Sequence, residues 1–194
     1  MHTTSQRIQL QRSYQSFLQP YQPFFQFALT LTLKQRAKVK TKRVNGSDEY
    51  FERWVGLSDE TLDSTIKRFN ARLTHALYGN QAKHKNKRDW ARPLLITATE
   101  GKCSTKRTHL HCALGNVPQQ CLPRINQIVA QAWSECDFGY KEIDVQVIYS
   151  AAGWRNYMTK EIGYVNNDAL DITHAFIPQI IQQSICTESR LQTD

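Results

Sequence analysis

The chain has 194 residues, enough for one well-buried domain and short for two. Its 25 Lys and Arg residues exceed its 17 Asp and Glu residues, which favours a polyanionic partner such as nucleic acid over a small acidic substrate. The five cysteines show no CxxC spacing, which argues against a zinc ribbon or a disulfide framework. No stretch approaches the roughly twenty apolar residues of a membrane span, so we expect a soluble cytoplasmic protein without membrane association.

The first part of the chain predicts one strand and a basic connection. Residues 1–23 are polar and rich in glutamine, and we expect a partly ordered lead-in. The stretch Phe24 to Lys34 alternates from Ala28 onward and is rich in β-forming residues, so it predicts a central strand. The basic stretch that follows contains an Asn45-Gly46 turn signal, which predicts a loop or a hairpin.

A helical pattern begins after Ser58. Apolar residues recur there at spacings of three and four, acidic residues occupy the first turn, and Gly79 marks the end. A second basic run, Lys83 to Arg92, leads into a predicted strand from Pro93 to Glu100. After a polar connection, the sequence "RTHLHCALG" predicts a further strand from Arg107 to Leu114.

The last part of the chain predicts a helix opened by Pro123, a strand from Ile143 to Ser150, and a third helix from Ala151 to Gly163. A C-terminal segment, 165–194, is interrupted by Pro178. The predicted order is therefore β-α-β-β-α-β-α within a single domain. It matches the α+β ferredoxin-like split βαβ arrangement, an antiparallel sheet with helices on one face and an open face on the other.

Two histidines alternate with one leucine in the predicted central strand. Because strand side chains alternate in direction, His109 and His111 point to one face and Leu110 to the other. Such a pair can hold a metal ion, act as an acid/base pair, or simply pack. If the preceding strand pairs through the turn at 101–106, Glu100 joins the two imidazoles, and this mixed N/O set suits Mn²⁺ or Mg²⁺. A zinc site that also uses Cys112 is disfavoured, because Cys112 points to the opposite face.

The stretch "WRNYMTKEIGY" predicts a helix with a reactive side and an anchoring side. Tyr157 and Lys160, at i and i+3, lie on the same side, while Trp154, Met158 and Ile162 form an apolar stripe that would anchor the helix to the sheet. A tyrosine hydroxyl has a pKa of about 10 and needs a nearby cation or a polarised electrophile to act as a nucleophile. Lys160 and a metal ion could supply these two effects.

These features together resemble the HUH endonucleases, specifically the replication-initiator (Rep) branch of rolling-circle replication proteins. "FALTLTLK" is similar to the first strand motif of that family, "HLH" at 109–111 to its His-hydrophobic-His motif, and "YMTK" at 157–160 to its YxxK motif. The match covers roughly 24–164, which we expect to be the catalytic core. The two terminal segments are not explained by it.

The resemblance implies a role for each matched residue. Tyr157 would attack a DNA backbone phosphate and form a 5′-phosphotyrosine link, while Lys160 would position or neutralise charge there. His109 and His111 would hold the divalent metal, with Glu100 as the third ligand. The substrate would be single-stranded or hairpin DNA at an origin. Because no GxxxxGK[ST] phosphate loop is present, unwinding would fall to a separate helicase.

The sequence differs from the motif patterns of related HUH branches, and these differences limit which branch it resembles. Relaxases usually carry the tyrosine before the histidines and a third histidine in the cluster, and single-tyrosine transposases commonly place a glutamine after the tyrosine. Neither relaxase feature occurs here, and Lys160 favours the Rep branch over a transposase. Tyr164 could be a second nucleophile, but we expect Gly163 to end the helix before it. A transposase, a mobilisation relaxase, or a non-catalytic basic nucleic-acid-binding module on the same kind of sheet remain alternatives.

The two basic runs are the expected DNA contacts, since Lys and Arg bind phosphates and supply affinity more than sequence choice. The candidate residues are Arg36, Lys38, Lys40, Lys42, Arg43, Lys83, Lys85, Lys87 and Arg88. Four aromatic residues near these runs could stack on unpaired bases or belong to a small core: Tyr50, Phe51, Trp54 and Trp90.

Overall fold

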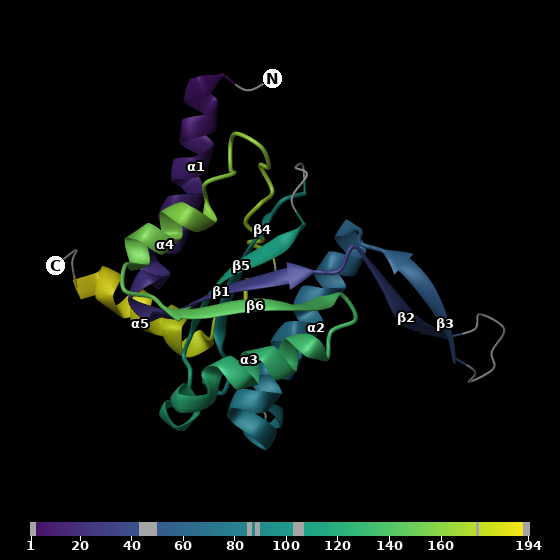
Figure 1. Cartoon of the computed structure of the whole chain (residues 1–194). Coiled ribbons are helices and arrows are strands. Elements are labelled where there is room, and N and C mark those ends of the chain that lie inside the picture. The colour runs from purple at the N-terminus through teal and green to yellow at the C-terminus, as the bar shows by residue number, and fades with distance from the viewer. Residues whose placement is uncertain are drawn as a thin grey trace.

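A computed structural model describes residues 3–42, 50–84, 87, 90–102, 107–173 and 175–191. Its strands are β1 (Phe25–Leu33), β2 (Arg36–Lys42), β3 (Tyr50–Gly56), β4 (Leu94–Glu100), β5 (His109–Gly115) and β6 (Gly139–Val147) (Figure 1). Its helices are α1 (Thr4–Leu18), α2 (Asp59–Tyr78), α3 (Ile125–Ser134), α4 (Ala151–Met158) and α5 (Gln179–Leu191). Short 3₁₀ helices span Gln19–Phe24, Gly79–Lys83 and Gln119–Arg124.

The central sheet has the ferredoxin-like arrangement that the sequence predicts. Its strand order is β4-β5-β1-β6, and every neighbouring pair is antiparallel. Strands β1 and β5 are the two inner strands, as predicted. The helices α2 and α3 follow β1 and β5 along the chain and pack on one face of the sheet (Figure 1). The α+β fold class is therefore confirmed.

The two faces of the sheet differ in what covers them. On the first face, Leu31 from β1 and Leu110 and Cys112 from β5 are fully buried in the core formed with α2 and α3. On the second face, Ile96 and Ala113 pack in a smaller apolar cluster with residues of α1, α4 and the C-terminal segment. The open face that the sequence predicts is therefore found only in part. The second face is buried along β4 and most of β5, where His111 lies, and is half-buried or exposed along β1 and β6.

The N-terminal lead-in was expected to be only partly ordered, and the structure instead folds Thr4–Leu18 into α1. The helix begins with a capping box in which the Thr3 hydroxyl accepts a hydrogen bond from the backbone N–H of Gln6, while the Gln6 side chain accepts one from the N–H of Thr3. Leu18 at its end is fully buried in the smaller apolar cluster.

The C-terminal segment covers the outer edge of β4. The backbone N–H of Leu95 donates to the carbonyl of Phe176, and the N–H of Phe176 donates to the carbonyl of Leu95. The N–H of Thr99 donates to the carbonyl of Ala169. These bonds satisfy groups that an edge strand would otherwise leave unpaired. This segment therefore continues the sheet by isolated bridges before α5 begins.

The helix predicted to open at Pro123 begins at Ile125, because Pro123 lies in the 3₁₀ helix Gln119–Arg124. Two other predicted boundaries differ by more residues. The strand expected at Ile143 to Ser150 runs from Gly139 to Val147. The helix expected to reach Gly163 ends at Met158, where Thr159 follows as the C-cap and the chain continues as turns. Gly163 adopts a φ of 84°, a left-handed conformation that favours glycine.

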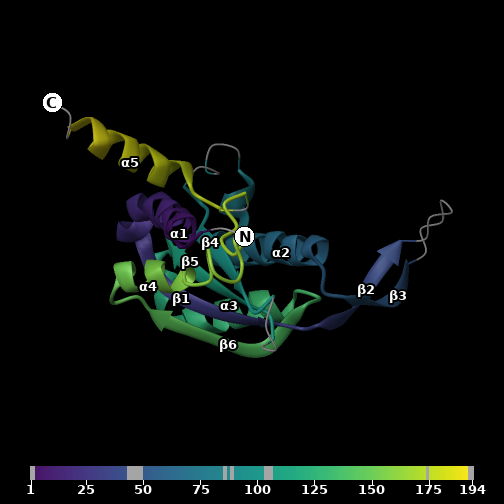
Figure 2. The same cartoon turned by 90° about the horizontal axis from the view of Figure 1, so that it is seen from above.

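Strands β2 and β3 form a separate two-stranded sheet that projects from the body in both views (Figures 1 and 2). Ala37, Val39 and Val55 pack toward the core at its base, whereas Arg36, Lys38 and Lys40 are exposed on alternate positions. This is the hairpin alternative of the sequence prediction. No helix among the described residues is long and apolar enough to cross a membrane.

Candidate active site

The register of β4 and β5 assembles a cluster of three potential metal ligands. Glu100 lies directly opposite His109, and the small Ala98 lies opposite His111. One ligand atom from each of Glu100, His109 and His111 lies within 4.8 Å of the others. Glu100 and His111 are 6% and 3% exposed, so the carboxylate and one imidazole are withdrawn from bulk water. The predicted convergence of these three side chains is confirmed, and the group could hold a metal ion.

The orientation of His109 suits metal coordination. Its Nδ1 lies 2.9 Å from the backbone carbonyl of Arg107, which can only accept, so Nδ1 carries the proton of the neutral ring. The Nε2 lone pair then faces the Glu100 carboxylate, with Nε2 and Oε2 3.5 Å apart. A second hydrogen-bond partner on the far nitrogen is the usual means of fixing the tautomer of a ligating histidine.

His111 is held between Glu100 and Thr30. Burial is the main cause that lowers its pKa to about 4, so the ring is neutral at pH 7. Its Nε2 lies 2.7 Å from Glu100 Oε2 and must carry the proton of that hydrogen bond, while the Thr30 hydroxyl, 3.2 Å from Nδ1, donates. If Nε2 released its proton to bind a metal, Nδ1 would become the donor, and the same hydroxyl could accept.

We therefore expect Thr30→Val to weaken Mn²⁺ binding by roughly 10- to 100-fold, the range typical of second-shell substitutions around metal-bound histidines. Valine keeps the β-branched shape and removes only the hydroxyl that orients His111. Isothermal titration with Mn²⁺ measures the change. The matched control is Thr32→Val on the same face of β1, opposite His109. Equal Mn²⁺ affinities for both variants and the parent protein would contradict the role of Thr30.

Lys160 completes the charge balance of the cluster. Its Nζ lies 2.6 Å from Glu100 Oε2. Burial is the largest single influence on both pKa values and opposes both charges. The hydrogen bonds and charges of the neighbouring groups together outweigh it, so the pKa of Glu100 is lowered by Lys160 and His111 and that of Lys160 is raised by Glu100 and Tyr157. Near neutral pH, the site therefore contains a carboxylate, an ammonium group and the neutral His111. The carboxylate also accepts the hydrogen bond of His111, which contributes to the lowered pKa.

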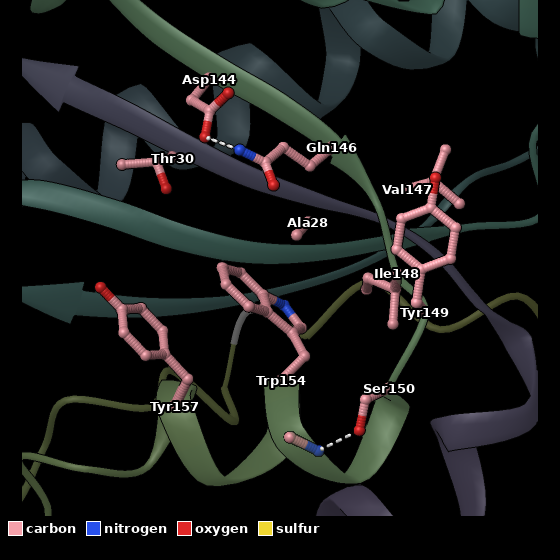
Figure 3. Close-up of a pocket in the computed structure, with 11 residues that line it drawn as sticks. Ala28, Thr30, Asp144, Gln146, Val147, Ile148, Tyr149, Ser150, Trp154 and Tyr157 are labelled. Carbon is pink, nitrogen blue, oxygen red and sulfur yellow. Dashed lines mark hydrogen bonds between the residues drawn. The ribbon is translucent and has the colours of Figure 1, made fainter.

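Tyr157 lies beside this cluster and remains accessible. Its ring packs against His111 in a T-shaped contact with centroids 4.7 Å apart, and Lys160 Nζ lies 3.7 Å from the ring centroid. The Trp154 ring stacks on the Tyr157 ring, with their centroids 5.3 Å apart. Both side chains extend from α4 toward the sheet (Figure 3). Tyr157 is 42% exposed, so a large substrate can reach its hydroxyl.

The predicted pairing of Tyr157 and Lys160 is found, although α4 ends between them. The backbone N–H of Lys160 donates to the carbonyl of Tyr157, which keeps the chain wound for one further turn. Met158 and Ile162 are buried on the sheet side, and Trp154 packs against the same cluster, as the predicted apolar stripe requires. Tyr164, 55% exposed, follows Gly163 outside the helix, as expected.

Helix α1 supports the end of α4, a role that sequence reasoning missed. The side-chain amide of Gln11 donates to the carbonyl of Thr159, and that of Gln15 to its hydroxyl. At Gly163, a Cβ atom would lie 2.6 Å from the backbone oxygen of Arg7, so only glycine permits this approach of α1. The N-terminal helix thereby holds the turn between Tyr157 and Lys160.

The predicted DNA contacts that the structure describes lie on β2 or at and after the 3₁₀ helix Gly79–Lys83, outside the metal-binding cluster. Lys38 and Lys40 project from β2, and Lys38 Nζ lies 5.8 Å from the centroid of the Trp54 ring. Lys83 and Lys87 are exposed, and Lys42 belongs to β2. Arg43, Lys85 and Arg88 lie outside the described residues. The four aromatic residues weighed as base-stacking or core groups are all exposed: Tyr50, Phe51, Trp54 and Trp90.

The described cysteines form no part of the site. Cys112 is buried on the opposite face of the sheet from His111, which removes it as a third ligand beside the histidines. Comparisons of the chain with protein-family models, with curated proteins and with solved structures found no match. The chemistry of the site therefore has to be argued from its own residues.

Proposed function

We propose that this protein is a metal-dependent endonuclease of the HUH type, which nicks and rejoins single-stranded DNA through a covalent bond to Tyr157. The observation that carries the proposal is the meeting of two elements. An accessible tyrosine and a lysine from the end of α4 contact the Glu100–His109–His111 cluster of β4 and β5. A nucleophile, a cation and a metal-binding set are thus within contact of one another, as phosphoryl transfer requires.

The reaction exchanges one phosphodiester bond for another. The Tyr157 oxygen forms a bond to the scissile phosphorus, and the bond between phosphorus and the 3′ oxygen breaks. The proton lost by the phenol balances the proton gained by the 3′-hydroxyl. The later attack of a 3′-hydroxyl on the phosphotyrosine reverses these steps, so rejoining needs no external energy source.

The residues around Tyr157 have separate tasks in this proposal. The chemistry that a divalent ion would supply at Glu100, His109 and His111 is polarisation of the phosphate. Lys160 is a poor general base because its pKa is raised, so it acts as a cation that favours the phenolate and offsets charge on the phosphate. The stacked Trp154 limits the orientations of the Tyr157 ring.

The β2–β3 hairpin is the proposed backbone-binding arm. We expect the double substitution Lys38→Gln with Lys40→Gln to weaken single-stranded DNA binding and to reduce the slope of log affinity against log salt by about 0.7 for each lost phosphate contact. Fluorescence anisotropy at several salt concentrations measures the slope. Lys67→Gln, on the exposed side of α2, is the control and should leave it unchanged. An unchanged slope in the double variant would exclude the hairpin lysines as phosphate contacts.

The experiment that tests the proposed activity is incubation of the protein with end-labelled single-stranded oligonucleotides and Mn²⁺, followed by a denaturing gel. We expect a protein-sized DNA adduct that a chelator abolishes. Binding without cleavage, over oligonucleotides that include sequences from the neighbourhood of the gene, would favour a non-catalytic binding module instead. Cleavage at a replication origin would support an initiator of rolling-circle replication, whereas cleavage at an element end or a transfer origin would indicate a transposase or a relaxase.

A further inference from the structure

A pocket on the active-site face lies next to Tyr157 but apart from the metal-binding cluster (Figure 3). Its volume is about 420 Å³, within the range of roughly 300–1,000 Å³ that is usual for small-molecule sites. The floor is formed by Ala28 and Thr30 of β1, and one wall by Trp154 and Tyr157 of α4. The pocket therefore shares Thr30, Trp154 and Tyr157 with the proposed active site and adds side chains from β6 and the chain after it.

The pocket walls carry aromatic surface suited to a flat ligand. Trp154 and Tyr157 are nearly parallel, with 14° between their planes. Tyr149 lines the pocket on the side away from Tyr157 and is 94% exposed, so its ring has almost no packing role in the described structure (Figure 3). Aromatic side chains at such sites stack on unpaired bases of single-stranded nucleic acid.

The polar groups of the pocket come from β6. Asp144 and Gln146 pair in register with Thr30 and Ala28, and both side chains are exposed on this face. The amide Nε2 of Gln146 donates to Asp144 Oδ2 across 2.9 Å, which leaves the carboxylate with further acceptor capacity and the amide with a second N–H. No Lys or Arg lines the pocket, and a carboxylate repels phosphate, so the backbone of a nucleic acid is not the group that fits here.

We infer that this pocket binds one unpaired base of the DNA next to the scissile phosphate and prefers guanine, an inference that rests on the proposed function. The Watson–Crick edge of guanine presents two adjacent donors, N1–H and the N2 amine, followed by the O6 acceptor. Asp144 supplies acceptors for the two donors, and the second N–H of Gln146 matches O6. Adenine, cytosine and thymine each present only one donor position on that edge. The pocket thus selects a base, while the hairpin contacts the backbone.

The test measures binding without cleavage, in the presence of a chelator. Three fluorescein-labelled octamers serve as probes: oligo(dT), the same octamer with one central dG, and the same octamer with deoxyinosine, which lacks the N2 amine. We expect the dG octamer to bind roughly 5- to 100-fold more tightly than oligo(dT), as a bidentate base contact allows, and deoxyinosine to lose part of that gain. Asp144→Asn should remove most of the dG preference and leave oligo(dT) binding at least as strong.

The matched control is Glu142→Gln, which removes the same charge two residues away on β6, outside the pocket. It should keep the dG preference. Tyr149→Ala should weaken binding of the dG octamer through lost stacking, by a factor similar to the preference of the parent protein for dG. Equal binding of the octamers by the parent protein, or a preference retained in Asp144→Asn, would overturn the pocket assignment. Adduct formation with no dG preference would support the nuclease and contradict the base-binding pocket. A dG preference without any adduct would support the base-binding pocket and contradict the nuclease. Failure to bind any octamer would overturn the pocket assignment, whereas the nuclease is tested separately by adduct formation with Mn²⁺.

Discussion

Tyr157→Phe should lower the yield of the covalent DNA adduct by at least about a thousandfold, because the substitution removes the only atom that can form the phosphotyrosine bond at this position. The fold should be retained, since the phenylalanine ring can keep the contacts of the Tyr157 ring with His111, Trp154 and Lys160. Mn²⁺ affinity and binding of single-stranded DNA should change little. A denaturing gel for the adduct, together with anisotropy for DNA binding, separates the loss of chemistry from the loss of affinity.

Tyr164→Phe is the matched control for this experiment. Tyr164 is exposed and follows Gly163 beyond the end of α4, so loss of its hydroxyl should leave the adduct yield unchanged. An adduct that persists in Tyr157→Phe and disappears in Tyr164→Phe would show that the nucleophile is assigned to the wrong tyrosine. An adduct that persists in both single variants would mean that either tyrosine can act as the nucleophile or that another residue does. Either result would contradict the assignment of Tyr157.

Glu100→Gln should weaken Mn²⁺ binding by more than about 100-fold, exceeding the range typical of second-shell substitutions. Glutamine preserves the shape of the side chain and one acceptor oxygen for His111 and Lys160, but it removes the negative charge that faces both imidazoles. Because that oxygen remains, we expect the variant to stay folded. Isothermal titration with Mn²⁺ measures the affinity, and circular dichroism verifies the fold.

Glu142→Gln controls for the loss of one carboxylate, since Glu142 is exposed on β6 and is not part of the metal-binding cluster. Its Mn²⁺ affinity should equal that of the parent protein. If Glu100→Gln bound Mn²⁺ as tightly as the parent, then Glu100 would not be a ligand. The Glu100–His111–Lys160 contacts would then be a purely structural hydrogen-bonded cluster.

The histidine strand could be predicted because its information is local. The two-residue period of a strand places His109 and His111 on one face, and a short connection to the preceding strand brings Glu100 beside them. The helix after Ser58 could be predicted for the same reason, since its limits are marked locally by Ser58, its N-cap, and Gly79, its C-cap. The turn signal predicted a loop or a hairpin, and the structure pairs β2 with β3, although Asn45 and Gly46 lie outside the described residues. The exposure of the aromatic residues of β3 could not be predicted, because it depends on what the rest of the fold leaves uncovered.

The missed parts of the site depend on contacts between distant segments. Thr30 reaches His111 only through the register of β1 and β5. The sequence predicts both strands to be central, but nothing near Thr30 indicates which residue of β5 it faces. Helix α1 is polar, with little apolar periodicity, and its partner Thr159 lies 148 residues from Gln11. The spacing of Thr3 and Gln6 was a usable signal for the start of α1, because it matches a capping box.

The most direct measurement of the central claim is the intact mass of the protein after incubation with a single-stranded oligonucleotide and Mn²⁺, followed by tandem mass spectrometry of the modified peptide. The account predicts a mass increase equal to the 5′-phosphorylated fragment on the 3′ side of the nick, less one water, located on Tyr157. The other fragment should end in a free 3′-hydroxyl. Cleavage products with the protein mass unchanged throughout the reaction, or a fragment attached to another residue, would contradict it.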